Sequence, residues 1–213
     1  EGKDVLCLSC GGGQQSAVFG LLGAHVTVVD LSHGQVAADR EAAAHHGYEV
    51  RAIHGDMRDL SMLEPDSFDI VYAMTPCYVP DIREVYVQVS RVLKPGGLYR
   101  TDISNPAIVS VKWDRDSYRI TTPYSQVKHP RDDGAMEFRH YFDDIFNGLR
   151  DSGLTLVDVE DGGRDRQVPS GAEPGTWTHE MNYVAGGFFI LARKTEGREA
   201  SPVIAHPRAD PTE

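Results

Sequence analysis

The chain has 213 residues, of which 40% are hydrophobic and 25% charged, and its formal net charge at pH 7 is −11. A chain of this length can bury a sizeable core in a single domain. The acidic balance argues against a nucleic-acid partner, which would require clustered Lys and Arg. The distribution of apolar and basic residues along the chain predicts neither a membrane span nor a signal segment. Three cysteines, at positions 7, 10 and 77, suit a reducing compartment, so we expect a cytoplasmic protein.

Strand and helix patterns alternate over the first hundred residues. Apolar runs predict strands at 5–8, 24–30, 48–56, 68–74 and 97–104. Helices are predicted at 16–22 and at 34–46, the second between a capping box at Ser32 and Gln35 and a stop at Gly47. A third helix has Pro80 at its first position and is broken by residues 94–97. This order predicts a parallel sheet with helices on both faces.

The second half of the chain has a different pattern. Alternating residues on either side of the polar turn 114–117 predict a hairpin laid over one end of the sheet. A helix closed by Gly153 follows, and then strands at 154–161 and 182–194. Segments 105–140 and 162–182 are expected to form a cover over a substrate. We expect one domain over 1–194 and a disordered tail over 195–213.

Three glycines, Gly11 to Gly13, follow the first strand, where α/β sheets bind ligands. A dinucleotide motif would have a third glycine or alanine at Ser16, and a P-loop would have a lysine after the glycines. A metal or redox site built on Cys7 and Cys10 is disfavoured, because residues three apart in a strand point to opposite faces. We expect these two thiols to be buried by packing, and no metal is predicted.

Acidic residues follow two of the predicted strands. Asp30 ends the second strand, where a carboxylate can accept both hydroxyls of a ribose. Asp56 follows the third strand and can accept a hydrogen bond from an adenine amino group, with Met57 packed on the base. Each acid alone could also occupy a polar turn. Together, on one rim of the sheet, they predict a nucleoside site.

With these features the chain resembles a class I S-adenosylmethionine-dependent methyltransferase. Five segments carry the resemblance: VLCLSCGGG, VTVVDLS, HGDMRDL, FDIVYAM and VLKPGG. It implies a Rossmann-like sheet of seven strands, mostly parallel with an antiparallel terminal strand, and a small β cover over the carboxyl edge. The cofactor it implies is S-adenosyl-L-methionine.

The resemblance also implies roles for individual residues. The methionine part of the cofactor is expected against Ser9, Cys10, Gly11, Gly12 and Gly13. The remaining expected contacts are Asp30 at the ribose, Leu31, Asp56 and Met57 around the adenine, and Met74 and Thr75 near the transferred methyl. Two positions depart from the family, which commonly has an acid at Cys7 and a glycine at Ser9. Losing the acid would rearrange the contacts to the amino group of the cofactor.

A small-molecule acceptor is favoured, and methyl transfer to its O, N or C atom would be an in-line displacement. Candidates for a catalytic base are Tyr78, His129, His140 and His179, although each can equally be structural. Aromatic residues concentrated in the cover can sandwich a small molecule or pack on the sheet. The alternatives are a non-catalytic module that binds the cofactor and an NAD(P)-dependent oxidoreductase. The oligomeric state is left open.

Overall fold

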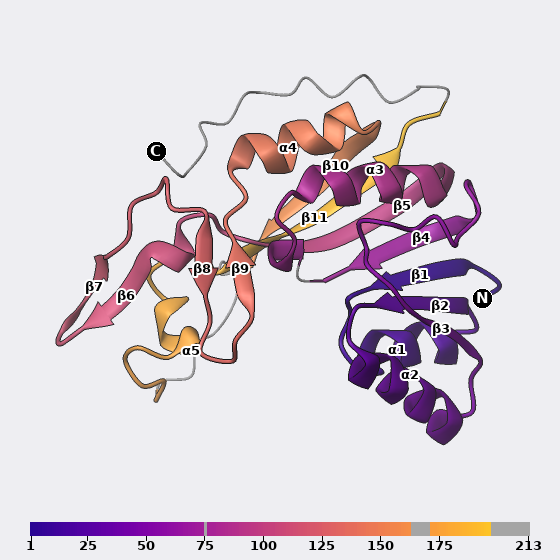
Figure 1. Cartoon of the computed structure of the whole chain (residues 1–213), viewed down its shortest axis with the longest axis horizontal. Coiled ribbons are helices and arrows are strands. Elements are labelled where there is room, and N and C mark those ends of the chain that lie inside the picture. The colour runs from indigo at the N-terminus through magenta and orange to yellow at the C-terminus, as the bar shows by residue number, and fades with distance from the viewer. Residues whose placement is uncertain (75, 163–170, 197–213) are drawn as a thin grey trace.

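The computed structural model describes residues 1–74, 76–162 and 171–196, and its main feature is a seven-stranded sheet (Figure 1). The strand order is β10-β11-β5-β4-β1-β2-β3. Strands β1 to β5 run parallel to one another, and β11 is antiparallel to both of its neighbours, β5 and β10. The expected fold class is therefore confirmed. The strands are β1 (Asp4–Leu8), β2 (His25–Asp30), β3 (Val50–His54), β4 (Phe68–Ala73), β5 (Leu93–Ser104), β10 (Leu154–Asp161) and β11 (Gly187–Lys194).

Helices cover both faces of this sheet (Figure 1). Helices α1 (Gln14–Leu21) and α2 (His33–His46) lie on one face, and α3 (Ile82–Val92) and α4 (Phe142–Asp151) lie on the other. The side chain of Ser32 accepts a hydrogen bond from the N–H of Gln35, and Gly47 ends α2 with a φ of 75°. These two residues set the ends of α2 as the sequence predicts.

Two predicted helix boundaries are wrong. Helix α3 begins at Ile82 rather than at Pro80, because the carboxylate of Asp81 caps it by accepting the N–H of Arg83 at 2.9 Å. Helix α1 begins at Gln14 rather than at Ser16. Residues 94–97 do follow the end of α3, but they belong to strand β5.

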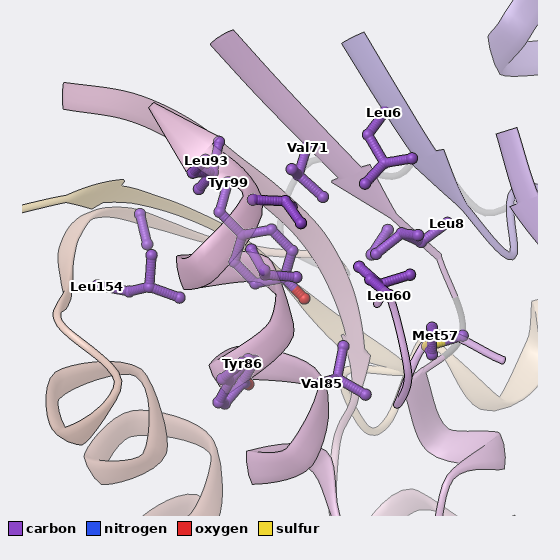
Figure 2. Packing of buried hydrophobic residues seen from close by; sticks show 14 of the residues in the cluster. Leu6, Leu8, Met57, Leu60, Val71, Val85, Tyr86, Leu93, Tyr99 and Leu154 are labelled. Carbon is purple, nitrogen blue, oxygen red and sulfur yellow. The ribbon is translucent and has the colours of Figure 1, made fainter. Parts of the chain in front are cut away.

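The larger part of the core lies between the sheet and the helices α3 and α4 (Figure 2). Helix α3 has an apolar face that is fully buried, with Ile82, Val85, Val89 and Val92 all at 0% exposure. Tyr86 of the same helix meets Tyr99 of β5 edge to face, with ring centroids 5.9 Å apart. Met57 belongs to this cluster, so the loop after β3 is anchored in the core.

A cover of short elements extends beyond one end of the sheet (Figure 1). The predicted hairpin is present as β6 (Val111–Asp114) and β7 (Ser117–Ile120). A second hairpin, β8 (Lys128–Pro130) with β9 (Met136–Phe138), and helix α5 (Trp177–Glu180) were not predicted, because three or four residues hold too little periodicity. The last strand, predicted from residue 182, therefore begins only at Gly187 as β11.

Buried Arg139 ties the cover together. Its guanidinium donates to the carbonyl of Pro106 at 2.6 Å, to Oγ of Ser110 at 2.6 Å and to the carbonyl of Gln126 at 3.0 Å. The guanidinium also lies 4.7 Å from the centroid of the Tyr124 ring.

The predicted domain range 1–194 stays a prediction. Residues 163–170, in the expected cover, and 197–213, in the expected tail, lie outside the described residues.

No helix within the described ranges is both long enough and apolar enough to cross a membrane. Among the same residues, no group of three or more His, Cys, Asp or Glu side chains is placed to hold a metal ion.

Candidate functional site

The turn between β1 and α1 is built from left-handed backbone. Ser9, Gly11, Gly12 and Gly13 have φ angles of 51°, 63°, 49° and 94°. A side chain at Gly12 would lie 2.5 Å from Oε1 of Gln35, and one at Gly13 would lie 2.6 Å from Cβ of Ala42. A side chain at Gly11 would meet no atom within 4 Å. The glycines thus let the turn pack closely on α2 and leave an open face at Gly11.

The expectation that Cys7 and Cys10 point to opposite faces is wrong. Strand β1 ends at Leu8, and the left-handed Ser9 turns the chain so that both cysteines enter one buried cluster. The thiol of Cys10 lies 3.3 Å from the carbonyl oxygens of both Leu8 and Tyr72. The neighbouring Cys7 thiol and burial hold the pKa of Cys10 well above its usual range. Both thiols are free, as the packing interpretation predicts.

Two adjoining cavities lie at the carboxyl ends of β1, β2 and β4. The larger has a volume of about 530 Å³ and the smaller about 320 Å³, and both are lined by Ser9, Asp30 and Tyr78. The larger also contains Cys10, Gly11, Gly12 and Met74 of the predicted set. The smaller also contains Leu31, Asp56 and Met57. Gly13 packs against α2 instead, and Thr75 lies outside the described residues.

Another hollow, of about 890 Å³, lies at the opposite ends of the strands. It is lined by charged side chains that include Asp4, Arg40 and Arg51, and by none of the predicted site residues. The site is therefore identified by the convergence of predicted residues and not by cavity size.

Asp30 occupies the junction of the two adjoining cavities. It is the last residue of β2 and is 7% exposed. Its Oδ1 accepts the N–H of Ser32 at 2.8 Å, and its carbonyl accepts the N–H of Gly55 at 3.0 Å. Within the described part of the chain we find no hydrogen bond to Oδ2. Asp30 is therefore held rigidly while keeping an oxygen for a ligand.

Asp56 is placed differently from the expectation. Its carboxylate forms an ion pair with Arg58, with Nη2 and Oδ2 2.6 Å apart, and it also accepts the N–H of Arg58 at 2.9 Å. The Arg58 guanidinium lowers the pKa of Asp56. The pair leaves less of the carboxylate for an adenine amino group than the sequence suggests. Met57, at 8% exposure, does form part of the wall of the smaller cavity.

Of the four predicted base candidates, only Tyr78 lines the two cavities. Burial raises the pKa of its phenol. His140 is buried beside Pro76, with its Nε2 3.1 Å from that carbonyl. His129 lies 2.9 Å from the carbonyl of Gln126, and His179 lies 2.8 Å from the hydroxyl of Tyr118. These three histidines hold the cover together.

The aromatic residues of the cover pack on one another. Tyr118 has the rings of Trp113, His179 and Tyr183 within 5.0 to 5.6 Å of its own centroid. Tyr124 and Tyr141 form a second pair at 5.2 Å. These rings are partners for one another, so the packing interpretation of the cover is the one that its geometry favours.

Several lining residues were not predicted from the sequence. Gln14, Gln15 and Gln35 line the larger cavity, and Arg58 and Val79 line the smaller one. The repeated glutamine directly after the glycines is the signal that could have pointed to the first two. For Gln35 the sequence predicts only a role in the helix cap with Ser32.

A buried polar cluster supports the turn from behind. Oγ of Ser16 donates to Oδ1 of Asp39 at 2.5 Å and lies 3.0 Å from the hydroxyl of Tyr48. The Asp39 carboxylate also accepts the N–H of Gly13, and burial raises its pKa. Ser16 and Asp39 are 1% and 4% exposed. A serine at this position therefore links α1 and the glycine turn to α2.

We predict that Ser9→Gly stabilises the protein by about 1 kcal/mol, because Ser9 is held in a left-handed conformation that costs a non-glycine residue roughly that much. Urea unfolding measures the change. Ser9→Ala is the matched control, since it removes the hydroxyl and keeps the strain. A gain in Ser9→Ala equal to that in Ser9→Gly would show that the hydroxyl, and not the backbone, is responsible.

Comparisons with known proteins point to methyltransferases. A family model described as "Methyltransferase domain" matches residues 5–97. The "Uncharacterized methyltransferase YbaJ" of Bacillus subtilis is 32% identical over 172 residues, which cover 74% of this chain and 68% of that protein. The "Ubiquinone biosynthesis O-methyltransferase" of Maricaulis maris is 29% identical over 167 residues, covering 71% and 65%. The chain spans about half the length of two other curated relatives that it matches.

A solved structure shares the fold. The S-adenosylmethionine-dependent methyltransferase from Mesorhizobium loti superposes with a TM-score of 0.76 and covers 90% of this chain and 91% of its own. Its sequence identity of 24% makes this a similarity of fold.

Proposed function

The chain belongs to the S-adenosylmethionine-dependent methyltransferases, and from this premise we propose that it methylates a small molecule while the two adjoining cavities hold the cofactor. Its cofactor is S-adenosyl-L-methionine. This membership removes the alternative of an NAD(P)-dependent oxidoreductase. The observation that carries the proposal is the pair of adjoining cavities that share Ser9, Asp30 and Tyr78.

The residues around the two cavities fit the three parts of the cofactor. The smaller cavity has apolar walls from Val29, Leu31, Met57 and Val79, which suit the flat adenine ring. Asp30 stands between the cavities with a carboxylate oxygen that can accept the ribose hydroxyls. The larger cavity offers the backbone of the glycine turn to the methionine part.

The cofactor supplies an activated methyl group, so the protein's main task is to orient the acceptor and to exclude water. Tyr78 is the one predicted base candidate at the cavities, and its raised pKa keeps the phenol protonated at neutral pH. In that state its hydroxyl donates a hydrogen bond. We infer that Tyr78 positions the acceptor and does not remove its proton.

Two observations support a small acceptor. The net charge of −11 is unfavourable for nucleic acid. A relative's name refers to O-methylation in ubiquinone biosynthesis. The atom methylated is left open between O, N and C. The free cysteines support a cytoplasmic location as part of this proposal.

Calorimetric titration with S-adenosylmethionine and S-adenosylhomocysteine tests the site, and a panel of hydroxylated and aromatic small molecules tests the acceptor class. We expect micromolar binding of both ligands and formation of S-adenosylhomocysteine with at least one acceptor. A folded protein that binds neither ligand would contradict the cofactor site. Binding without turnover on small molecules, but with turnover on a protein or RNA, would contradict the acceptor class.

A further inference from the structure

Gln15 carries a buried oxygen for which the protein provides no donor. It is the second residue of α1, and its Nε2 donates to Sδ of Met74 at 3.0 Å. Oε1 is buried and has no hydrogen-bond partner among the described residues. A thioether is a weak acceptor, and a buried acceptor left without a donor costs about 1–3 kcal/mol. The side chain is thus in an unfavourable arrangement.

Gln15 belongs to the wall of the larger cavity, together with Cys10, Gly11 and Met74. The contact with the sulfur of Met74 is the one hydrogen bond of this side chain among the described residues, so a rotation that would direct the amide oxygen into the cavity breaks no stronger bond. The described lining of this cavity contains one carboxylate, Asp30, and that residue lies at the junction with the smaller cavity. Its other side-chain acceptors are the hydroxyls of Ser9 and Tyr78 and the amides of three glutamines, 14, 15 and 35. Among the described residues of this lining, Oε1 of Gln15 is the side-chain oxygen that is buried without a partner.

Cys7 cannot supply the missing acceptor. It is 0% exposed and lies in the buried cluster behind the turn, next to Cys10. S-adenosylmethionine carries two positive groups, the ammonium of its methionine part and the sulfonium. A site that holds this part of the cofactor needs an acceptor or dipole directed at one of them, because a desolvated charge without a partner is costly.

We propose that Oε1 of Gln15 is the acceptor for a positive group of the bound cofactor, ammonium or sulfonium. The inference rests on the cofactor placement proposed above. It explains why an amide, and not an apolar side chain, stands at this position of the helix, since binding turns an uncompensated oxygen into a charge-assisted contact. Gln15 is a binding residue in this assignment, and it has no part in proton transfer.

The test compares Gln15→Met with Gln15→Glu, which keep the length of the side chain but respectively remove the acceptor and charge it. Dissociation constants are measured for S-adenosylmethionine, S-adenosylhomocysteine and 5′-methylthioadenosine, the last of which has neither positive group. Thermal unfolding confirms that both variants fold. We expect Gln15→Met to weaken S-adenosylmethionine binding by about tenfold or more, and to change methylthioadenosine binding by less than about twofold.

Gln15→Glu is expected to bind S-adenosylmethionine at least as tightly as the parent does. If Gln15→Met also weakens S-adenosylhomocysteine, the group contacted is the ammonium, and if it does not, the group is the sulfonium. Unchanged binding in Gln15→Met, an equal loss for methylthioadenosine, or an equal loss in Gln15→Glu would each overturn the assignment. Failure of the parent to bind S-adenosylmethionine would instead overturn the cofactor placement.

Discussion

Replacement of Asp30 with alanine is expected to weaken the binding of S-adenosylhomocysteine by at least about a hundredfold. The carboxylate sits between the two cavities, and its Oδ2 is available for the ribose hydroxyls. Hydrogen bonds to a charged group contribute about 1.5–3 kcal/mol each, so the loss of two of them amounts to roughly two decades of affinity. Isothermal titration of parent and variant measures the change.

Two variants separate this effect from a general disturbance of the site. Asp30→Asn keeps one carbonyl oxygen and is expected to lose less affinity than Asp30→Ala. Asp56→Ala is expected to have a smaller effect than Asp30→Ala, because the Asp56 carboxylate is already paired with Arg58. If Asp30→Ala bound S-adenosylhomocysteine as well as the parent does, the ribose would have to lie elsewhere.

The fold followed from the sequence because its signals are regular and local. Strands such as β1 and β2 are continuous apolar runs, and α2 has both a cap at Ser32 and a stop at Gly47. Asp30 could be placed because the carboxyl ends of parallel strands converge at one edge of a sheet. Apart from Gly13 and Thr75, the residues predicted to contact the cofactor line the two cavities at that edge.

What the sequence failed to show depends on which side chains pair with one another or on a single backbone angle. Cys7 and Cys10 enter the same cluster because Ser9 between them has a left-handed backbone conformation, which the periodicity of apolar residues in the sequence does not predict. The Asp56 carboxylate can accept from two donors, the Arg58 guanidinium or an adenine amino group, and only the geometry shows that it is paired with Arg58. His179 and His140 have structural partners, Tyr118 and Pro76, that lie more than 60 residues away in the sequence.

The cluster behind the glycine turn shows how such contacts bear on the site. Asp39 joins α2 to Ser16 of α1 and to the N–H of Gly13. Asp39→Ala is expected to lower the free energy of unfolding by about 2–4 kcal/mol, because two buried donors lose a charged acceptor. It should also weaken S-adenosylhomocysteine binding by loosening the turn. Urea unfolding and calorimetry measure the two effects, and a variant as stable as the parent would contradict the role of the cluster.

Asp39→Asn is expected to change how stability depends on pH. Burial raises the pKa of the Asp39 carboxyl above its usual 3.8, so the folded protein holds this proton more tightly than the unfolded chain does. The stability linked to this proton is complete below about pH 4 and is lost as the pH rises through the raised pKa. The free energy of unfolding of the parent, relative to that of Asp39→Asn, should therefore fall as the pH rises above about 4. A difference that grows with pH would mean that hydrogen bonds from Ser16 and Gly13 outweigh the cost of burying the charge, and that Asp39 is ionised throughout.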